Sequence, residues 1–262
     1  MLGNNVTLII RATQESAVLL RKMGVLFVGL CASVSMQAAD ILRFAASTSW
    51  NMPYAKFENE RMTSGIVFDL AQSLERELGL PLVFVPLSRK SLDGAALAGD
   101  YDLRCYLTPQ WTEIPDKFAW SPKLFDITDV VFGSQTVSDP KSLAGIPRGS
   151  AISAVLGYSY PTLEPLFASG QLKRDDTSGQ ENVMLKMDVG RTPYGVSDAL
   201  ALNWYVRTTP QHRLSKWRIG ISRHDFQCAV PNNGNVSAVK ILKALEDLKR
   251  NGRIEEILKN YR

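Results

Sequence analysis

Histidine, cysteine and unbalanced charge are scarce in this chain. Its 262 residues include two histidines and three cysteines, and the formal net charge is only +4. No glycine-rich phosphate loop, Gly-x-Ser-x-Gly or His-Glu-x-x-His motif occurs. His212 and His224 lie twelve residues apart in polar surroundings, which is typical of surface histidines. These absences argue against an enzyme, and we expect no catalytic residue, no metal and no cofactor.

Charge is also evenly divided along the chain. Beyond residue 39 there are 27 basic and 25 acidic residues, with no long run of either sign. A nucleic-acid-binding surface needs clustered lysine and arginine. We therefore expect no nucleic-acid partner.

The N-terminus has the pattern of a secretory signal peptide. Arg21 and Lys22 precede an apolar stretch from Gly24 to Met36, and the small residues Ala38 and Ala39 follow. The stretch is well short of the ~20 residues that a membrane-spanning helix needs, although a permanent anchor is the alternative. We expect residues 1–39 to be removed and the remaining chain to be periplasmic.

Two cysteines, Cys105 and Cys228, remain beyond the expected cleavage site. An even pair in an oxidising compartment is a candidate disulfide, and two small buried hydrophobic side chains are the alternative. The sequence leaves these two interpretations open.

Strand and helix patterns alternate through most of the chain, which predicts an α/β fold with mostly parallel sheets flanked by helices. The first helix is expected to be capped by Thr63 or Ser64 and to end at Gly79. Further on, Pro161 is expected to begin a helix toward Phe167. The expected strands are 41–46, 82–87, 102–107, 127–133, 152–156, one near 172 and 194–196, and the other helices are 91–98, 182–189 and 198–205.

The C-terminus carries the clearest helical periodicity. Apolar residues recur at helical spacing up to Gly252, and a second short helix continues the pattern to Tyr261. The residues of this expected apolar face are Val236, Val239, Leu242, Leu245, Leu248, Ile254, Ile257 and Leu258. Both helices need a sheet to cover.

Several short motifs occur in a characteristic order between Leu42 and Tyr261. They are Pro53-Tyr54, Gly65 to Leu70, Gly99 to Asp102, Phe118 to Pro122, Ser142 to Gly145, Gly157 to Tyr160, Cys228 to Pro231 and Leu245 to Tyr261. Each motif alone is weak, but the ordered set resembles the extracellular solute-binding proteins of family 3, the amino-acid-binding class that serves ABC importers.

That resemblance implies a two-lobed periplasmic-binding-protein fold of type II, in which two crossover strands join two α/β lobes. Lobe 1 would comprise residues 40–130 and 224–262, and lobe 2 residues 131–223. A small polar, amino-acid-like ligand would bind in the cleft and close the hinge. The implied protein is a monomer that passes its ligand to an ABC permease. A sensor that docks on a membrane receptor, or less directly a dehydratase-type enzyme, is the alternative.

One position departs from the family pattern. The family's carboxylate-binding arginine would stand three residues after Thr108, but Trp111 stands there. Arg104 is a candidate substitute, because strand alternation places Arg104, Tyr106 and Thr108 on one face. A salt bridge or a side chain at the rim of the cleft is the alternative role for Arg104.

The resemblance also points to ligand contacts in the second block. Asp198 matches the aspartate that receives a ligand's amino group, and the alternative is a simple helix N-cap. Gly157, Tyr158 and Ser159 match a loop whose backbone N–H groups, at a helix N-terminus, receive an anionic group. The alternative for this loop is an ordinary turn.

An aromatic wall is expected in the first loop. Trp50, Asn51 and Tyr54 match the segment that lies over the ligand in the family. Trp50 and Trp111 together could sandwich a flat or cationic group, and the alternative is that each packs on its own lobe.

Overall fold

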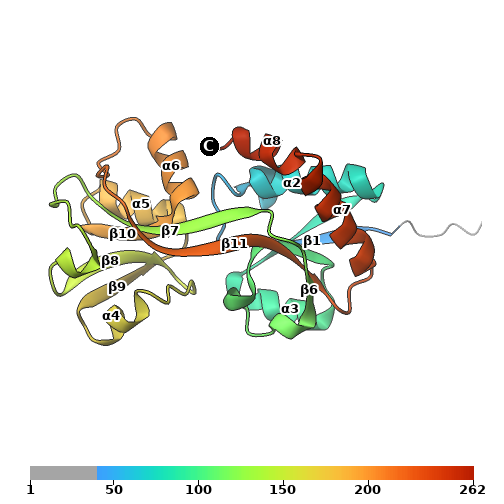
Figure 1. Ribbon diagram of the computed structural model, residues 1–262, viewed down its shortest axis with the longest axis horizontal. Helices are drawn as coiled ribbons and strands as arrows, with labels where there is room; N and C mark the ends of the chain where they lie inside the picture. The colour runs from blue at the N-terminus through green and yellow to red at the C-terminus, as the bar shows by residue number, and fades with distance from the viewer. Residues whose placement is uncertain (1–39) are drawn as a thin grey trace, which may run out of the picture. The chain divides into compact units, whose positions relative to one another are not determined.

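The computed structural model describes residues 40–262 (Figure 1). The expected signal peptide at residues 1–39 lies outside the described residues. Within residues 40–262, no helix combines the length and the apolar character that crossing a membrane requires.

The first half of the structure is built on a mixed sheet in the strand order β4-β1-β5-β11, with β6 paired to β11. Strands β4, β1 and β5 are parallel, and β11 runs antiparallel to β5. The bounds of these strands are β1 Leu42–Ser47, β4 Leu82–Leu87, β5 Leu103–Leu107, β6 Phe118–Trp120 and β11 Ile219–Pro231. Helices α2 (Ile66–Leu78), α7 (Ala238–Arg250) and α8 (Arg253–Lys259) pack together over one face, and α3 (Leu92–Ala98) covers the other.

The second half repeats this layered arrangement. Its strand order is β11-β7-β10-β8-β9, in which β10, β8 and β9 are parallel and β7 is antiparallel to β10. The strands are β7 Phe125–Gly133, β8 Ser150–Val155, β9 Leu172–Thr177 and β10 Tyr194–Asp198. The helices are α4 Glu164–Ala168, α5 Gln180–Asp188 and α6 Ala199–Thr208.

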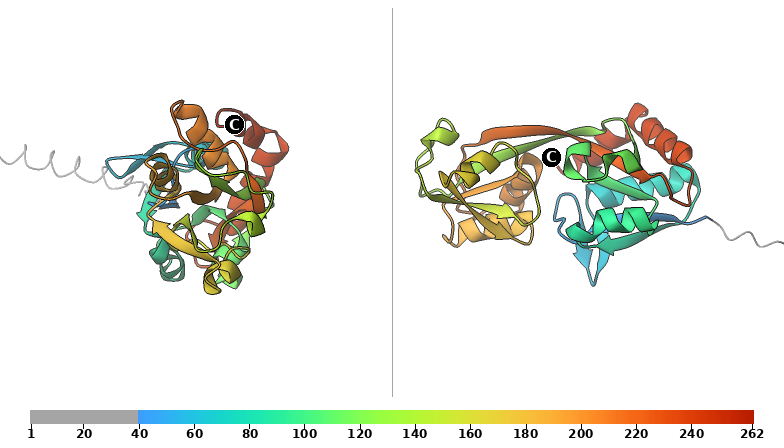
Figure 2. Two further views of the ribbon diagram at one scale, coloured as in Figure 1. Left: turned by 90° about the vertical axis from the view of Figure 1, so that its left-hand side faces the viewer. Right: turned by 90° about the horizontal axis from the view of Figure 1, so that it is seen from below.

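Two long strands connect the halves. β7 and β11 pair antiparallel from Phe125 opposite Phe226 to Val131 opposite Ile219. Beyond this pairing, β11 continues into the first half, where it joins β5. Both strands can be followed from one half to the other in Figures 1 and 2. The two-lobed α/β fold with two crossover strands is therefore confirmed.

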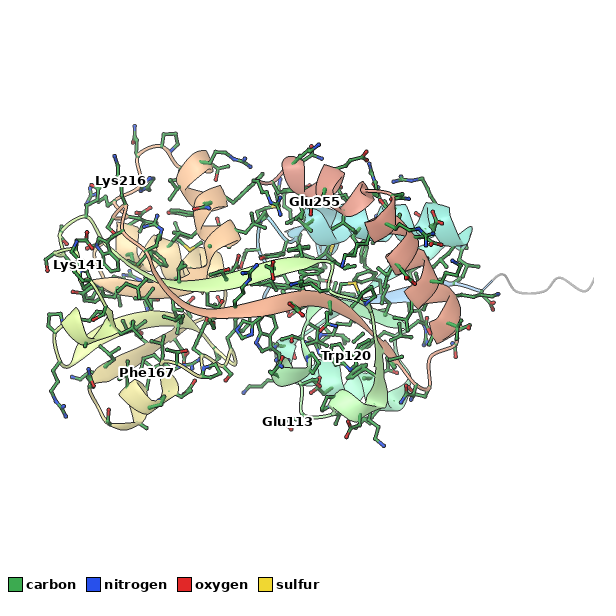
Figure 3. All side chains as sticks on the ribbon, viewed as in Figure 1. Glu113, Trp120, Lys141, Phe167, Lys216 and Glu255 are labelled. Carbon is green, nitrogen blue, oxygen red and sulfur yellow. A yellow bond between two sulfur atoms is a disulfide. The ribbon has the colours of Figure 1, made fainter. Side chains whose placement is uncertain are left out.

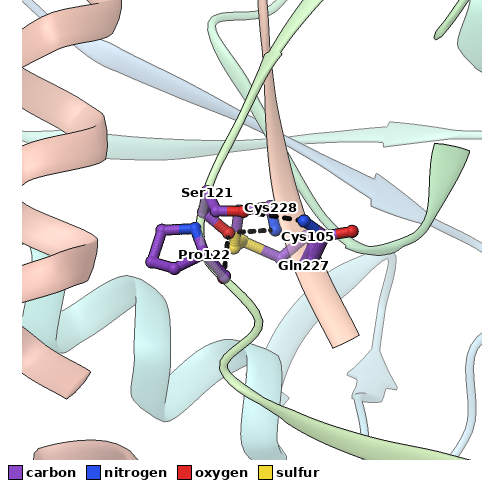
Figure 4. The surroundings of a disulfide bond; sticks show 5 residues. All are labelled: Cys105, Ser121, Pro122, Gln227 and Cys228. Carbon is purple, nitrogen blue, oxygen red and sulfur yellow. Dashed lines mark hydrogen bonds between the residues drawn. A yellow bond between two sulfur atoms is a disulfide. The ribbon is translucent and has the colours of Figure 1, made fainter. Parts of the chain in front are cut away.

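A disulfide ties β5 to the crossover strand β11. Cys105 and Cys228 are bonded through their sulfur atoms, with their Cα atoms 3.9 Å apart and a sequence separation of 123 (Figure 4). Around it, the Cys228 N–H donates to Ser121 Oγ at 2.9 Å, and Gln227 donates through Nε2 to the Ser121 carbonyl at 2.7 Å. The strand that carries Arg104 and Tyr106 is thus fixed to the hinge.

Strand β5 does not alternate regularly. Gln227 is opposite Leu107 and Cys228 is opposite Cys105, so Tyr106 is an extra residue with no partner on β11. Its φ of 58° lies in the left-handed region, which is uncommon for a large side chain. Simple alternation therefore does not set the direction of the Tyr106 side chain. Arg104 and Tyr106 nevertheless line one cavity, and Thr108 is the member of the expected set that does not.

The first helix begins differently from the expectation. Thr63 and Ser64 belong to a short hairpin of β2 (Lys56–Glu58) and β3 (Arg61–Ser64), so neither caps the helix. Gly65 precedes the helix with φ 117°, and a Cβ at this position would lie 2.4 Å from the Tyr54 carbonyl oxygen. The helix therefore starts at Ile66, where the close approach of Gly65 to the Tyr54 backbone fixes it. The spacing of apolar residues gives no sign of this contact.

Two other helix predictions need correction. Pro161 does not begin α4, which starts three residues later at Glu164. The buried face of α7 consists of Ile241, Ala244, Leu245 and Leu248, whereas Val239 is 76% exposed. Val236 is buried but lies before the first residue of α7, so the prediction that it belongs to the apolar face of the helix is wrong.

Candidate functional site

A cavity of about 440 Å³ is lined by residues from both halves of the structure. From the first half come Trp50, Arg89, Lys90, Asp93, Arg104, Tyr106, Gln110, Trp111, Thr112 and Glu113. From the crossover strand and the second half come Asp129, Gly157, Tyr158, Ser159, Tyr160 and Gln180. The lining is mixed in character, because five aromatic rings alternate with charged and amide groups. This composition suits a small ligand with both a flat body and a charged group.

Arg104 is the most deeply buried cation of the lining. It is 2% exposed, and its Nη1 donates to Asp93 Oδ1 at 3.1 Å. Its Nε is buried and has no hydrogen-bond partner among the described residues. Burial, and then the positive charge of Arg89, lower the pKa of Arg104. An unsatisfied buried donor on a charged group is costly, and a ligand oxygen would satisfy it.

Two more cations stand beside Arg104. Arg89 and Lys90 follow directly after β4, in a short 3-10 turn that Ser88 caps. Arg89 donates through Nη2 to the Trp111 carbonyl at 2.6 Å. Within residues 40–262, neither Arg89 nor Lys90 forms an ion pair with an acid. Two cations without an ion-pair partner among these residues therefore lie beside Arg104 in the cavity lining.

The acid nearest to these cations is fully engaged. Asp93 accepts from Arg104 through one oxygen, and through the other from Thr112 Oγ1 at 2.8 Å and the Glu113 N–H at 3.1 Å. Glu113 itself is exposed, and its side chain lies at the lower edge of the molecule in Figure 3. Asp93 thus orients the arginine and the loop after β5.

Aromatic side chains form a connected group along the cavity. The ring centroid of Tyr106 lies 5.7 Å from that of Trp50 and 5.9 Å, edge-on, from that of Trp111. Trp111 in turn contacts the imidazole of His224 at 5.0 Å. Trp50 and Trp111 both line the cavity, as a stacking role requires, but each also packs on a protein ring. His224 is not a surface residue as its polar surroundings predict, because it is enclosed by Trp111 and the crossover strands.

Asp198 lies behind this aromatic group and does not line the cavity. Its Oδ1 accepts from the N–H groups of Leu200 and Ala201, both at 3.0 Å, and from the Tyr54 hydroxyl at 2.9 Å. Its Oδ2 accepts from the Tyr106 hydroxyl at 3.3 Å, and Gln180 Nε2 donates to that hydroxyl at 3.1 Å. Asp198 therefore caps α6 and also joins the two halves.

Burial dominates the electrostatics of this cluster. It raises the pKa of Asp198 to about 6, although hydrogen bonds from Ala201 and Tyr54 oppose the shift. Burial, followed by the charge of Asp198, also raises the pKa values of Tyr54 and Tyr106 well above the ordinary range. Both phenols therefore remain protonated donors at neutral pH.

A second acid, Asp129, is at the floor of the cavity on β7. Its Oδ2 accepts from Ser222 Oγ at 2.7 Å and lies 3.3 Å from His224 Nε2, both on the neighbouring crossover strand. Asp129 is 7% exposed. The two crossover strands thus present an acid and an imidazole side by side.

The loop of Gly157, Tyr158 and Ser159 lines the cavity, but it is not at a helix N-terminus, because α4 begins only at Glu164. The Tyr158 N–H donates to the Val155 carbonyl at 3.1 Å. Arg174 holds the loop, since its Nη2 donates to the Val155 and Tyr158 carbonyls at 2.9 and 2.8 Å. The expected helix start after this loop is therefore wrong, and a contact between the loop N–H groups and a ligand stays a prediction.

The structure brings most of the expected residues to one cavity. Those that line it are Trp50, Arg104, Tyr106, Trp111, Gly157, Tyr158 and Ser159, and those that do not are Asn51, Tyr54, Thr108 and Asp198. Asn51 contacts Glu181 across the cleft at 3.4 Å, and Thr108 donates to Gln110. Sequence reasoning missed Arg89 and Lys90, whose position just after a parallel strand is a usable signal, because ligands bind at the carboxyl ends of such strands.

No protein-family model and no curated protein matches the chain. Solved structures do match. An ancestral arginine-binding protein bound to arginine aligns at TM-score 0.71 and 20% identity over 84% of this chain and 97% of its own. A substrate-binding protein of an amino-acid ABC transporter aligns at 0.67 and 17% over 85% and 99%. An ancestral amino-acid-binding protein described as a precursor of cyclohexadienyl dehydratase aligns at 0.67 and 17% over 84% and 94%. The chain shares their two-lobed fold.

Proposed function

We propose that this chain, which has the fold of amino-acid-binding solute-binding proteins, is an exported binding protein that captures a small anionic molecule for an ABC importer. The observation that carries the proposal is Arg104, a buried cation that lines a two-sided cavity and has an unpartnered Nε. A carboxylate oxygen would supply the missing acceptor in a charge-assisted hydrogen bond. Arg89 and Lys90 add positive charge on the same side.

The cavity supports capture by closure of the two halves. Its lining comes from both, so a ligand contacts the whole set only when the halves are together. Such contacts stabilise the closed state selectively. We place the lobe boundaries at residues 40–130 with 224–262 and at 131–223, so that β7 and β11 form the hinge. A monomer suffices for this mechanism.

Roles for the remaining residues follow from their positions. Trp50, Trp111 and Tyr158 would form the walls for a flat ligand body, and Gln110 and Gln180 would supply neutral hydrogen bonds. Asn51, Tyr54, Thr108 and Asp198 would act from behind the lining. The described residues contain no cluster of three acids, cysteines or histidines able to hold a metal, and the proposal needs none.

Docking of the closed form on a membrane receptor uses the same clamp and is the principal alternative. A dehydratase would be favoured by the neighbour described as a precursor of such an enzyme. Genes for a permease and an ATPase beside this gene would favour transport, and turnover of a cyclohexadienyl acid would favour the enzyme.

A thermal-shift screen of carboxylates tests the proposal. The panel comprises amino acids, 2-oxo acids, dicarboxylates and aromatic acids, and a ligand at 100 times its Kd should stabilise the fold by about 2.7 kcal/mol. Arg104→Ala should lose this stabilisation, whereas Arg148→Ala should keep it, because Arg148 is exposed and donates only to the Ser169 carbonyl at 3.5 Å. Equal stabilisation of wild type and Arg104→Ala by the same acid would remove Arg104 from the site.

A further inference from the structure

The acids around the cavity are already occupied by protein donors. Asp93 has three donors on its two oxygens. Asp129 accepts from Ser222 and lies beside the His224 imidazole. Glu113 is exposed at the rim, where an ion pair contributes little. A cationic group on a ligand would therefore have to compete with existing partners at Asp93 and Asp129, and the carboxylate of Glu113 offers only an exposed contact.

Asp198 is closed to the cavity more completely. It is 1% exposed, and four donors converge on its two oxygens, which is the usual capacity of a carboxylate. The two donors on the cavity side are the hydroxyls of Tyr54 and Tyr106. An ammonium group could reach Oδ2 only by displacing Tyr106, and Oδ1 only by displacing Tyr54 or a helix N–H group.

The backbone shows that the position of Tyr106 is imposed. Its φ of 58° places a bulky residue in the left-handed region, a conformation that persists only where surrounding contacts enforce it. Those contacts are the stack on Tyr54, with ring centroids 3.9 Å apart, and the hydrogen bonds to Asp198 and Gln180. The bulge is what carries the phenol hydroxyl to Asp198.

The cations of the cavity lining, unlike the three aspartates above, are not fully paired with groups of the described residues. Arg89 and Lys90 have no acid partner among residues 40–262, and the Arg104 Nε has no hydrogen-bond partner. Three cations and three acids line the cavity, but Arg89 and Lys90 form no ion pair with an acid of this part of the chain. A carboxylate would therefore find cations without an ion pair, while an ammonium would lie near their positive charge.

We infer that the ligand is a carboxylate without an ammonium group, and that Tyr54 and Tyr106 determine this specificity by occupying Asp198. The inference rests on the proposed function, since it assumes that an acid binds at Arg104. The ligand class is a deaminated acid with a flat or apolar body, which the tryptophan walls would hold. Amino acids of the same skeleton would be rejected.

Isothermal titration calorimetry with matched pairs tests the inference. The pairs are 3-phenylpropionate with L-phenylalanine, indole-3-propionate with L-tryptophan, and glutarate with L-glutamate, so each differs only in the ammonium group. For at least one pair, the deaminated acid should bind the wild-type protein at least tenfold tighter. Amino acids that bind as tightly as their deaminated partners would overturn the inference but leave the proposed function standing. Absence of binding by every compound would overturn both.

Variants locate the specificity. Tyr54→Phe with Tyr106→Phe removes the two hydroxyls and should reduce the preference for the deaminated acid at least threefold, because Asp198 loses its cavity-side donors. Tyr205→Phe is the matched control, since Tyr205 donates to Asp188 at 2.5 Å and does not line the cavity. It should keep the full preference. An unchanged preference in the double variant would overturn the role of these tyrosines.

If the double variant does not fold, Asp198→Asn gives the same information. It should change the affinity for the acid and for its amino-acid partner by the same factor. Selective loss of amino-acid binding in Asp198→Asn would show that a ligand ammonium reaches Asp198 and would overturn the inference.

Discussion

Arg104 and Asp198 are two buried charges of opposite sign, one in each half of the molecule, and their surroundings differ in kind. Asp198 has four hydrogen-bond donors and no place in the cavity lining. Arg104 has one acid partner, one unpartnered nitrogen and a place in the lining. A buried charge that the protein satisfies completely serves the fold, whereas one left partly unsatisfied is available to a ligand.

The largest expected change in the free energy of unfolding comes from substitution of Asp198, whose hydrogen bonds are all satisfied by the protein. Asp198→Ala leaves two tyrosine hydroxyls and two helix N–H groups without an acceptor. Loss of the cap and of these buried partners should lower the free energy of unfolding by about 4 kcal/mol. Urea denaturation of the ligand-free protein measures this change. A loss below about 1 kcal/mol would mean that the four donors find other partners.

The pH dependence of stability sharpens the comparison further. The pKa of Asp198 is raised to about 6 in the folded protein, above the value near 3.9 in an unfolded chain. Between these values the folded state keeps the proton and the unfolded state has lost it, so rising pH favours unfolding. Across its whole titration, from below pH 3 to above pH 7, this group should lower stability by about 3 kcal/mol, of which about 2 kcal/mol falls between pH 4 and pH 6.

Asp198→Asn should remove that slope, as urea denaturation at pH 4, 5, 6 and 7 would show. Tyr54, Tyr106 and Asp129 face Asp198 and stay unchanged in this variant. Asp102 contributes little over this range: burial opposes ionisation of its carboxyl, but the bonds with Arg43 outweigh burial and lower its pKa, so its contribution is lost mainly below about pH 4. An identical slope in Asp198→Asn would assign the pH dependence to another group.

The smallest change in the free energy of unfolding is expected from substitution of Arg104, whose Nε has no hydrogen-bond partner among the described residues. Arg104→Met removes a buried, partly unpaired charge and replaces it with an apolar side chain of similar length. Asp93, the partner left behind, is 24% exposed and keeps the donors Thr112 and the Glu113 N–H, so its charge is not left buried and unpaired. The unfolding free energy of the ligand-free protein should stay within about 1 kcal/mol of wild type. A loss of 3 kcal/mol or more would show that the ion pair of Arg104 with Asp93 stabilises the fold. Arg104 would then serve the fold as Asp198 does.

Much of the fold could be predicted from the sequence because its signals are local. The apolar periodicity of α2 and the left-handed glycines at the ends of α2 and α3 locate those helices. Asp198 is recognisable as a cap because it directly precedes α6. The bulge at Tyr106 has no local signal, since it arises from pairing between β5 and the distant β11.

The site was only partly predictable for the same reason. Arg104 stands out as a charge inside an apolar strand, and Trp50 and Trp111 as large aromatics in loops. The closure of Asp198 by Tyr54 joins residues 144 positions apart, and the contact of Asp129 with Ser222 joins residues 93 apart. Which polar groups are already satisfied depends on such distant pairs, and sequence position alone does not give them.

The backbone and the side chain at position 106 favour different residue types. Its main chain favours glycine or asparagine, while its side chain must carry a hydroxyl across to the other half. Substitution of Tyr106 by glycine or asparagine would relieve the backbone strain but would remove the hydroxyl that donates to Asp198 Oδ2. On the inference above, that single substitution would let amino acids bind. Among descendants of this gene, the identity of residue 106 should therefore track the chemistry of the cargo.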